Sequence, residues 1–352
     1  MDSFEKAKAL KEKARELGFI LSGITQADPS PHYAHYQKWI ETKKHAGMDY
    51  LERRLKERAS PCSILPSVKS ILSLALPYSP PPLSHQRQAL LATEFQDPVW
   101  TKRHKDEAPQ NHTSNLALIA SYALGSEDYH PVVVRKLKDL ETFSQTKLQI
   151  SEARGCVDTA PLLERSYAER AGLGWIGKNT MLINSQEGSY FFLAELLLSE
   201  ELPSDGISPN QCGTCTRCLD ACPTNALAPY EMTSDLCISY QTIENKESEF
   251  RQATFTGPYL FGCDICQIVC PWNHRAKETA IPEFYPNDAL THLTLKELKA
   301  MDESEYKRRF SKTALKRPKW SGFLRNFKNS LKWYEKQGAS AMVPKEKGRP
   351  SP

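Results

Sequence analysis

Eight of the ten cysteines lie between residues 212 and 270, in two motifs whose spacing suits metal binding. The first motif reads Cys212-Gly-Thr-Cys215-Thr-Arg-Cys218-Leu-Asp-Ala-Cys222-Pro223. The second reads Cys263-Asp-Ile-Cys266-Gln-Ile-Val-Cys270-Pro271. Cysteines at this spacing before a proline bind pairs of [4Fe-4S] clusters, and the proline-flanked cysteine of each motif binds the partner cluster. The sequence therefore predicts two such clusters, which transfer single electrons.

The second motif lacks the first cysteine of the pattern, because Leu260 occupies that position. Cys237 is the obvious substitute, and it leaves no thiol of the region unused. With crossed ligation, the predicted ligands of the first cluster are Cys212, Cys215, Cys218 and Cys270. The predicted ligands of the second cluster are Cys222, Cys237, Cys263 and Cys266.

Two other uses of these thiols fit poorly. Structural zinc needs only four ligands and no third cysteine at two-residue spacing. A disulfide framework is disfavoured because the N-terminus has no secretory signal and cysteines three residues apart bridge badly. Cys62 and Cys156 lie outside the motifs, and we expect both to be small buried side chains.

Asp158 lies where an apolar segment around Cys156 runs into a helix start, with Pro161 in its first turn. It has two interpretations. The carboxylate could cap the helix by accepting backbone N–H bonds. Alternatively, it could be a catalytic acid, which would need partial desolvation to raise its pKa towards neutrality.

The string Gly172-Leu-Gly174-Trp-Ile-Gly177 matches the glycine pattern of dinucleotide-binding proteins, but its context does not. That fingerprint follows a strand and opens a helix, whereas this string follows a helix and leads into an apolar stretch. We expect the glycines to let the backbone approach a bulky flat ligand, with Lys178 and Asn179 supplying polar contacts. Tight packing alone is the alternative.

The chain divides unevenly in charge. From Tyr306 onward it has 14 Lys and Arg against two Glu, a net charge of +12, whereas the whole chain has +4. Aromatic residues lie among these charges, a mixture suited to phosphate contacts and base stacking: Phe310, Trp320, Phe323, Phe327, Trp333 and Tyr334. An amphipathic helix with a solvated basic face is the alternative interpretation.

The composition, 40% hydrophobic and 25% charged, is that of a soluble globular protein. Helical patterns cover residues 4–17, 34–44, 48–58, 132–144, 293–309 and 321–336, and apolar segments at 19–24 and 70–76 predict strands. This alternation predicts an α/β (α+β) domain over residues 1–205, with a loop insertion at 79–111. A ferredoxin-like two-cluster domain over 206–280, a basic helical region over 281–337 and a disordered tail over 338–352 would follow.

Several motifs of this sequence occur together in one known family. They are Met48-Asp-Tyr-Leu-Glu-Arg-Arg with Arg58, Ser121-Tyr-Ala-Leu-Gly-Ser-Glu-Asp-Tyr-His130, Val157-Asp-Thr-Ala-Pro161, Gly172-Leu-Gly-Trp-Ile-Gly-Lys-Asn179, Cys237-Ile-Ser-Tyr-Gln-Thr-Ile-Glu244 and Phe261-Gly-Cys-Asp-Ile-Cys-Gln-Ile-Val-Cys-Pro-Trp272. In these motifs, from about residue 5 to residue 335, the chain resembles the epoxyqueuosine reductases, which are cobalamin and iron–sulfur enzymes that complete queuosine synthesis in tRNA.

The resemblance implies that the protein reduces the epoxide of epoxyqueuosine to the alkene of queuosine in a tRNA anticodon loop. Electrons would pass through the clusters to cobalt, which attacks or coordinates the epoxide, and Asp158 would protonate the departing oxygen. The implied cobalamin contacts are Arg58, Ser121, Asp158, Leu163, Asn179, Leu182 and Leu193. Asp128-Tyr129-His130 has Val133 where the His-ligated cobalamin signature has glycine, which is compatible with the family's cobalamin binding without a histidine ligand.

The resemblance also implies that the basic C-terminal region contacts tRNA. An unidentified electron donor, a cytoplasmic location, a monomer and no association with membranes complete the expectation. A reductive dehalogenase is the alternative within enzymology, although those proteins typically carry a twin-arginine export signal. A ferredoxin-like electron carrier is the alternative from another class, although a carrier needs neither a residue such as Asp158 nor a basic C-terminal region.

Overall fold

The computed structural model describes residues 1–79, 117–249 and 257–341. The predicted insertion therefore lies, apart from Ser79, outside the described residues. The C-terminal helix α14 (Lys319–Ala341) includes residues 338–341, so the first four residues of the expected disordered tail are helical, which corrects that boundary. The rest of the tail lies outside the described residues.

A four-stranded sheet forms the centre of the N-terminal part. Its strand order is β1 (Leu21–Gln26), β2 (Ser70–Pro77), β7 (Phe191–Leu198) and β4 (Ala153–Cys156). All three strand pairs are antiparallel. Alternating helices and strands often indicate a parallel sheet, so the α+β form of the prediction is the one that describes this sheet.

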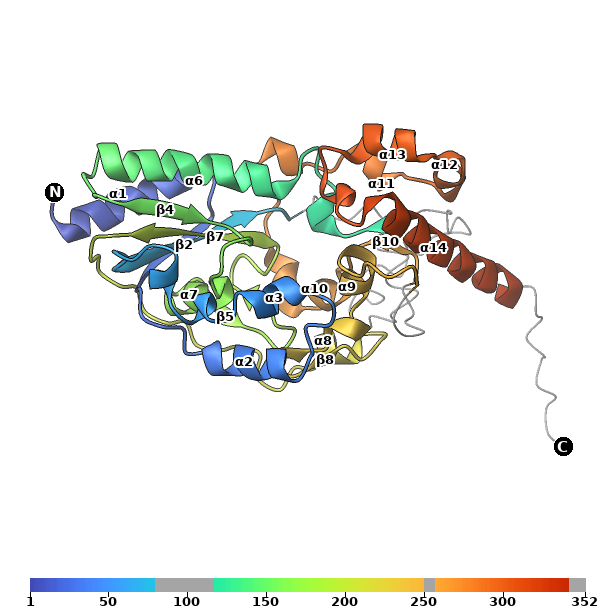
Figure 1. Cartoon of the computed structure of the whole chain (residues 1–352), viewed down its shortest axis with the longest axis horizontal. Helices are drawn as coiled ribbons and strands as arrows, with labels where there is room; N and C mark the ends of the chain where they lie inside the picture. Colours follow the sequence, from blue (N-terminus) through green and yellow to red (C-terminus); the bar gives the residue numbers. More distant parts are fainter. Residues whose placement is uncertain (80–116, 250–256, 342–352) are drawn as a thin grey trace.

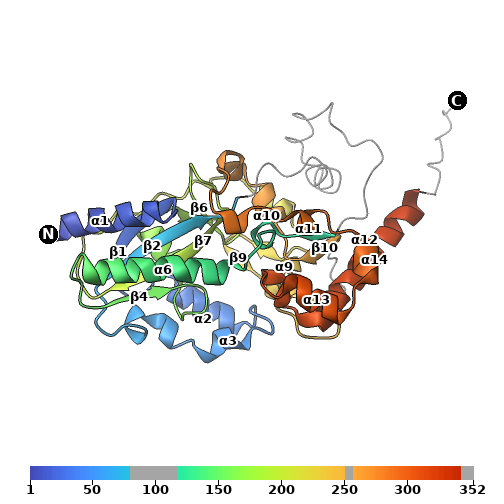
Figure 2. The same cartoon turned by 90° about the horizontal axis from the view of Figure 1, so that it is seen from above.

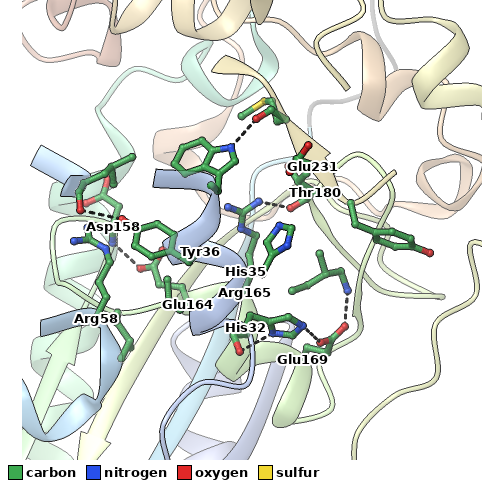
Figure 3. A pocket seen from close by; sticks show the side chains of 18 of the residues that line it. His32, His35, Tyr36, Arg58, Asp158, Glu164, Arg165, Glu169, Thr180 and Glu231 are labelled. Atoms are coloured by element: carbon green, nitrogen blue, oxygen red, sulfur yellow. Dashed lines mark hydrogen bonds and ion pairs between the residues drawn. The ribbon is translucent and has the colours of Figure 1, made fainter. Parts of the chain in front are cut away.

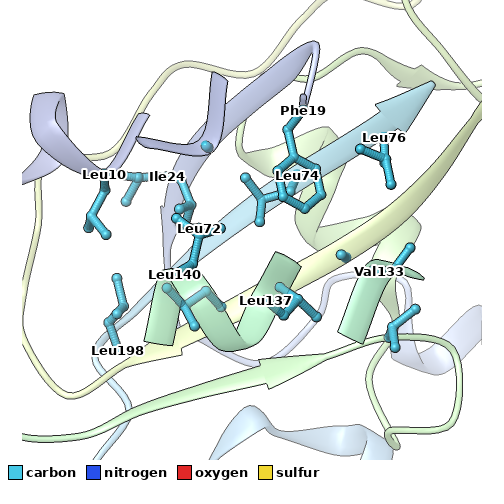
Figure 4. Close-up of a cluster of buried hydrophobic side chains, with 14 of the residues drawn as sticks. Leu10, Phe19, Ile24, Leu72, Leu74, Leu76, Val133, Leu137, Leu140 and Leu198 are labelled. Carbon is cyan, nitrogen blue, oxygen red and sulfur yellow. The ribbon is translucent and has the colours of Figure 1, made fainter. Parts of the chain in front are cut away.

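Helices cover both faces of this sheet (Figure 1). α1 (Ser3–Glu16) and α6 (Tyr129–Thr146) lie on one face, and α7 (Glu164–Arg170) lies on the other. A capping box between Asp2 and Glu5 starts α1, which contributes about 1 kcal/mol to helix stability. The side chains between the first two helices and the sheet are apolar and fully buried, among them Leu10, Ile24, Leu72, Leu137 and Leu140 (Figure 4). Each such side chain stabilises the fold by about 2 kcal/mol.

Shorter elements complete the N-terminal part. The remaining helices of this part are α2 (Tyr33–Glu41) and α3 (Asp49–Arg53), with single 3₁₀ turns at Glu57–Ala59, Pro61–Ser63 and Ser121–Ala123. β5 (Trp175–Ile176) and β6 (Leu182–Ile183) form a small hairpin. Cys156 is buried as expected, but Cys62 is exposed, because it lies in a surface 3₁₀ turn capped by Ser60.

The cysteine motifs lie on short helices and turns. These elements are α8 (Arg217–Asp220), β8 (Leu227–Ala228), β9 (Glu231–Met232), a 3₁₀ turn at Ser234–Leu236, α9 (Ile238–Ile243), β10 (Tyr259–Phe261), α10 (Ile265–Ile268) and a 3₁₀ turn at Pro271–Arg275. β10 pairs in parallel with β3 (Leu118–Ile119), so the segment that precedes α6 joins the cluster region. The two parts are therefore interlocked along the chain.

The C-terminal helices pack at the end of the molecule away from α1 (Figure 2). They are α11 (Asp288–Thr291), α12 (Leu295–Ala300), α13 (Glu303–Phe310) and α14, with 3₁₀ turns at Pro282–Phe284 and Ala314–Lys316. The pattern over 293–309 is thus two helices, because Asp302 caps a new helix. No helix in the described ranges is long and apolar enough to cross a bilayer.

The aromatic residues of the C-terminal region form a core. Phe310, Phe323, Phe327 and Trp333 are buried, and Trp320 and Tyr334 pack against the same cluster. The four buried rings therefore stabilise the helices and cannot stack on bases, whereas for the partly exposed Trp320 and Tyr334 base stacking stays a prediction. Residues at helical spacing among charges are as readily a core stripe as a stacking surface.

Candidate active site

A cavity of about 590 Å³ lies between the N-terminal part and the cluster region. Residues of α2, α7 and the β8–β9 hairpin line it, together with Asp158 and Arg58 (Figure 3). In this view Asp158, Arg58 and Glu164 lie on one side, and Thr180 and Glu231 lie on the other. The volume is within the range of small-molecule and cofactor sites. We call it the Asp158 cavity.

Asp158 is held by contacts on every polar atom of its carboxylate. Tyr129 donates its hydroxyl to Oδ2 at 2.5 Å, and Nδ1 of His130 lies 2.8 Å from Oδ1. The backbone N–H of Asp158 donates to Oε1 of Glu164 at 2.7 Å. The residue has a φ of +31°, a strained conformation for a residue with a side chain, and such strain is concentrated at functional sites.

The helix-cap interpretation of Asp158 is wrong. α7 begins only at Glu164, and Leu163 occupies the N-cap position without a side-chain bond. The carboxylate of Asp158 instead accepts bonds from α6, which comes from a distant part of the sequence. Its place is at the wall of the Asp158 cavity.

Tyr129 is itself held from two sides. Its ring stacks on Phe192 with centroids 4.2 Å apart and planes inclined by 12°. The guanidinium of Arg317 lies 4.8 Å from its ring centroid and also binds Asp128 at 2.9 Å. Burial and the neighbouring Asp158 carboxylate raise the pKa of Tyr129 far above its ordinary value, so its hydroxyl stays a donor. Arg317, one of the basic C-terminal residues, therefore supports this site.

The first group of thiols gathers around Cys218. Burial, together with the neighbouring thiols of Cys270, Cys212 and Cys215, raises its pKa to about 11. The indole N–H of Trp175 donates to Cys212 Sγ at 3.4 Å.

The second group gathers around Cys266. Burial raises its pKa well above the ordinary value, and the neighbouring thiols of Cys237, Cys218 and Cys222 add to this. Cys263 is likewise raised by burial and then by Cys266 and Cys237. The described part of the chain includes all ten cysteines, and no three His, Cys, Asp or Glu residues in it can hold one metal ion.

The chain is similar to known proteins in both sequence and structure. The family described as "Epoxyqueuosine reductase QueG" matches residues 58–159, and the one described as "4Fe-4S double cluster binding domain" matches residues 211–273. The epoxyqueuosine reductase of Pseudomonas aeruginosa is 37% identical over 323 residues, which cover 91% of this chain and 83% of the relative.

This chain belongs to the epoxyqueuosine reductase family. Another epoxyqueuosine reductase, from Leadbetterella byssophila, is 38% identical over 326 residues, covering 91% of this chain and 96% of the relative. A crystal structure of an epoxyqueuosine reductase with an epoxyqueuosine-modified tRNA-Tyr stem loop matches with a TM-score of 0.79 at 28% identity, covering 96% of this chain and 84% of that one. The family makes the chain an oxidoreductase with a double [4Fe-4S] domain, and the recognition made from its motifs is confirmed.

The contacts expected from the epoxyqueuosine reductases are only partly brought together. Arg58, Asp158 and Leu163 line the Asp158 cavity. Ser121 donates its backbone N–H and hydroxyl to Asp264, and Asn179 donates its amide to the carbonyl of Cys266. Leu182 is buried in a hydrophobic cluster against which Leu193 packs, so these two do not line the cavity.

Two glycines of the string pack against backbone. A Cβ on Gly172 would meet the backbone of Gly206, and one on Gly174 would meet the carbonyl of Ile183. Lys178 donates to the carbonyls of Gly213 and Cys215 at 2.8 and 2.9 Å, so it supports the first cysteine loop. The alternative of tight packing is therefore correct for these two glycines, and the expected ligand approach there is wrong.

Sequence reasoning alone missed Tyr129, His130 and Glu164 as parts of the site. Tyr129 and His130 open α6, directly after the capping Asp128, in a motif that was used only for resemblance. The available signal is a tyrosine and a histidine side by side at the start of a long helix. The sequence contains no signal for a role of Glu164 in the site, because acidic residues are common in the first turn of a helix.

Proposed function

We propose that this protein reduces epoxyqueuosine to queuosine in a tRNA anticodon loop, with Asp158 as the proton donor. The observation that carries the proposal is an aspartate at the cavity wall, in strained backbone and held by Tyr129 and His130, in a chain of the epoxyqueuosine reductase family. One solved relative is described as having its catalytic aspartate loop swung out of the active site, which supports a mobile acid at this loop.

We also propose the two predicted ligand sets for the clusters. The thiol neighbours of Cys218 are the other three members of the first set. Two members of the second set, Cys237 and Cys222, are neighbours of Cys266. The neighbouring positions of Cys218 and Cys266 would bring the two clusters close enough to exchange electrons. Each cluster would supply electrons singly.

We propose that the Asp158 cavity holds part of a bound cobalamin, because Arg58, Asp158 and Leu163 of the expected contacts line it. Its walls combine apolar and aromatic side chains with many charged and polar ones, and both the N-terminal part and the cluster region contribute residues. Arg58, Asp158 and Leu163 would hold the cofactor from one side, and Thr180 from the other. When bound, cobalamin would supply the low-valent cobalt needed for a two-electron reduction of the epoxide.

The chain's own residues would then control the proton. Reducing an epoxide to an alkene expels its oxygen as water, and the departing oxygen needs protons because an alkoxide is a poor leaving group. Asp158 would donate one proton from the carboxyl, and its other oxygen would stay bound to Tyr129 or His130. Those two contacts fix the direction in which the carboxyl points.

The tRNA would be bound by exposed lysines of the C-terminal region. Lys312, Lys319, Lys328 and Lys332 are exposed there, whereas Arg317 and Arg325 are engaged within the fold. Phosphate contacts from such lysines position a nucleic acid without reading its sequence. A tRNA substrate would also place the protein in the cytoplasm.

Anaerobic reconstitution with iron, sulfide and cobalamin tests this function. The wild-type protein should convert epoxyqueuosine in an anticodon stem loop to queuosine, detected by mass spectrometry of the released nucleosides. Asp158→Ala should keep the cofactor spectra and lose turnover, whereas Asp139→Ala, an exposed aspartate on α6, should keep both. Protein that contains both clusters but never binds cobalamin or converts substrate would favour an electron carrier.

A further inference from the structure

Glu195 is a buried acid that the proposed reaction leaves without a role. It lies on β7 in the middle of the sheet, with no exposed surface. Its neighbours across the strands are Ser73 on β2 and Cys156 on β4. Neither carboxylate oxygen finds a hydrogen-bond donor among the described residues, and the Ser73 hydroxyl also lacks a partner there. An ionised carboxylate in such a place is strongly disfavoured.

The polar group that faces Glu195 is the carboxyl of Glu164 on α7. Burial raises the pKa of Glu195 well above the ordinary value, and the charge of the Glu164 carboxylate and its closeness, within reach of a shared proton, raise it further. Burial also raises the pKa of Glu164 to about 7. Two carboxyl groups in contact can satisfy each other only if one of them keeps a proton and donates it.

Glu164 connects this pair to the site. Its Oε1 accepts the backbone N–H of Asp158 at 2.7 Å, and its side chain lines the Asp158 cavity. Asp158 has a positive φ, so its loop needs a fixed partner to stay in that conformation. If Glu195 is protonated, it can donate a hydrogen bond to Oε2 of Glu164. That bond would fix the Glu164 carboxylate, whose Oε1 accepts the Asp158 N–H.

We propose that Glu164 and Glu195 share one proton and that this pair positions Asp158 in the cavity. The proposal rests on the proposed function only for the role of Asp158. Glu164 and Glu195 are positioning residues, because nothing places them against the substrate. With the proton shared, the pair has one negative charge. Loss of that proton leaves two carboxylates in contact, which drives Glu164 away from the Asp158 N–H.

Other groups around the pair set the pH at which this happens. Burial and the charge of the Asp158 carboxylate oppose the ionised form of Glu164, whereas the backbone N–H of Asp158 and the charges of Arg165 and Arg58 stabilise it. Around Glu195 lie Cys156 and Tyr167, whose own pKa values burial and nearby carboxylates raise, and the neutral Ser73. The hydroxyl of Tyr167 and the thiol of Cys156 therefore stay neutral. The Glu164–Glu195 pair is then the group that loses a proton as the pH rises above neutrality.

Infrared spectroscopy of the reconstituted holoprotein tests the shared proton without relying on activity. At about pH 7, the wild type should show one more protonated carboxyl group than Glu195→Gln, because in that variant Glu164 ionises alone at lower pH. The extra band should disappear as the pH is raised. Equal bands in the wild type and in Glu195→Gln at that pH would overturn the shared proton.

The pH profile of epoxide reduction tests the positioning role. The wild-type rate should fall as the pH rises above neutrality, and Glu195→Gln should extend its plateau by about one pH unit, since an amide always donates to Glu164. Glu195→Leu removes the donor and should lower kcat about tenfold with little change in KM. A wild-type rate in Glu195→Leu, or an unshifted profile in Glu195→Gln, would refute the positioning role.

Two further variants show whether a change in rate comes from the Glu164–Glu195 pair or from Asp158 itself. Glu141→Gln is the matched control, because Glu141 accepts the backbone N–H of Gly155 at 2.6 Å on the opposite face, and its profile should stay that of the wild type. If Glu195→Leu does not fold, the infrared comparison and Glu195→Gln still decide. Full activity in Asp158→Ala would remove the proposed role of Asp158, whereas the infrared result would stand by itself.

Discussion

Arg325 offers a sharp prediction, because it separates a structural use of the basic C-terminal region from a use in tRNA binding. Its guanidinium is buried in α14 and donates to three backbone carbonyls. Nη2 bonds Gln241 at 2.7 Å, and Nη1 bonds Asn245 at 2.9 Å and Glu247 at 2.7 Å. Gln241 belongs to α9, which begins directly after Cys237, a predicted ligand of the second cluster.

Arg325→Met keeps most of the side-chain volume and removes these three bonds, together with the two that the guanidinium donates to Oδ1 of Asn326. Each bond from a charged donor contributes about 1.5–3 kcal/mol, and buried carbonyls without a donor add a penalty. Since the three contributions are not additive and water can reach part of the gap, we expect a loss of about 4 kcal/mol. For a protein of this size, that lowers the thermal midpoint by about 10 °C. The second cluster should be lost first.

The assay is anaerobic thermal unfolding together with iron content per chain. Lys328→Met is the matched control, because Lys328 is a basic residue on the same helix with an exposed side chain. It should keep the wild-type midpoint and iron content, and instead weaken stem-loop binding and reduce its salt dependence by about one phosphate contact. Arg325→Met with a wild-type midpoint, full iron content and weakened stem-loop binding would refute the reasoning.

Three further predictions concern the site and the clusters. Tyr129→Phe removes one bond to Asp158 and should lower kcat about tenfold at unchanged cofactor content, measured under saturating stem loop. Cys237→Ala should reduce iron from about eight to about four per chain; unchanged iron would exclude Cys237 as a ligand. The pKa of Glu195 is higher in the folded protein than in the unfolded chain. The unfolded chain therefore loses this proton at lower pH, and the folded state loses stability as the pH rises between the two pKa values. Glu195→Gln should therefore gain stability relative to the wild type at pH 8 and not at pH 4, measured by thermal midpoints.

The cysteine motifs could be interpreted from the sequence because ligand spacing is a local property. Cys218 and Cys270 are far apart in the chain, yet their places within two known motifs predicted that they would meet. The helices also followed local signals, such as the capping box of α1. The order of the strands could not be predicted from local signals. The antiparallel pairing of β2 with β7, for example, joins segments more than a hundred residues apart in the sequence.

The predictions from sequence that the structure corrects concern residue types that occur both in a packed core and at a ligand-binding surface. Phe323 and Phe327 could have stacked on bases, but they fill the core beneath α14. Gly174 could have faced a ligand, but the backbone of Ile183 occupies that space. Glu164 and Glu195 became a pair only through the fold, because the helix of one packs on the strand of the other. No local pattern encodes that contact.

The most direct test of the central claim is the nucleoside composition of tRNA from cells that lack this protein. Deletion should replace queuosine by epoxyqueuosine in mass spectra of digested tRNA. Expression of the wild-type chain should restore queuosine, and expression of Asp158→Ala at equal protein level should not. Queuosine at its normal level in the deletion strain, with no epoxyqueuosine, would contradict the proposed function.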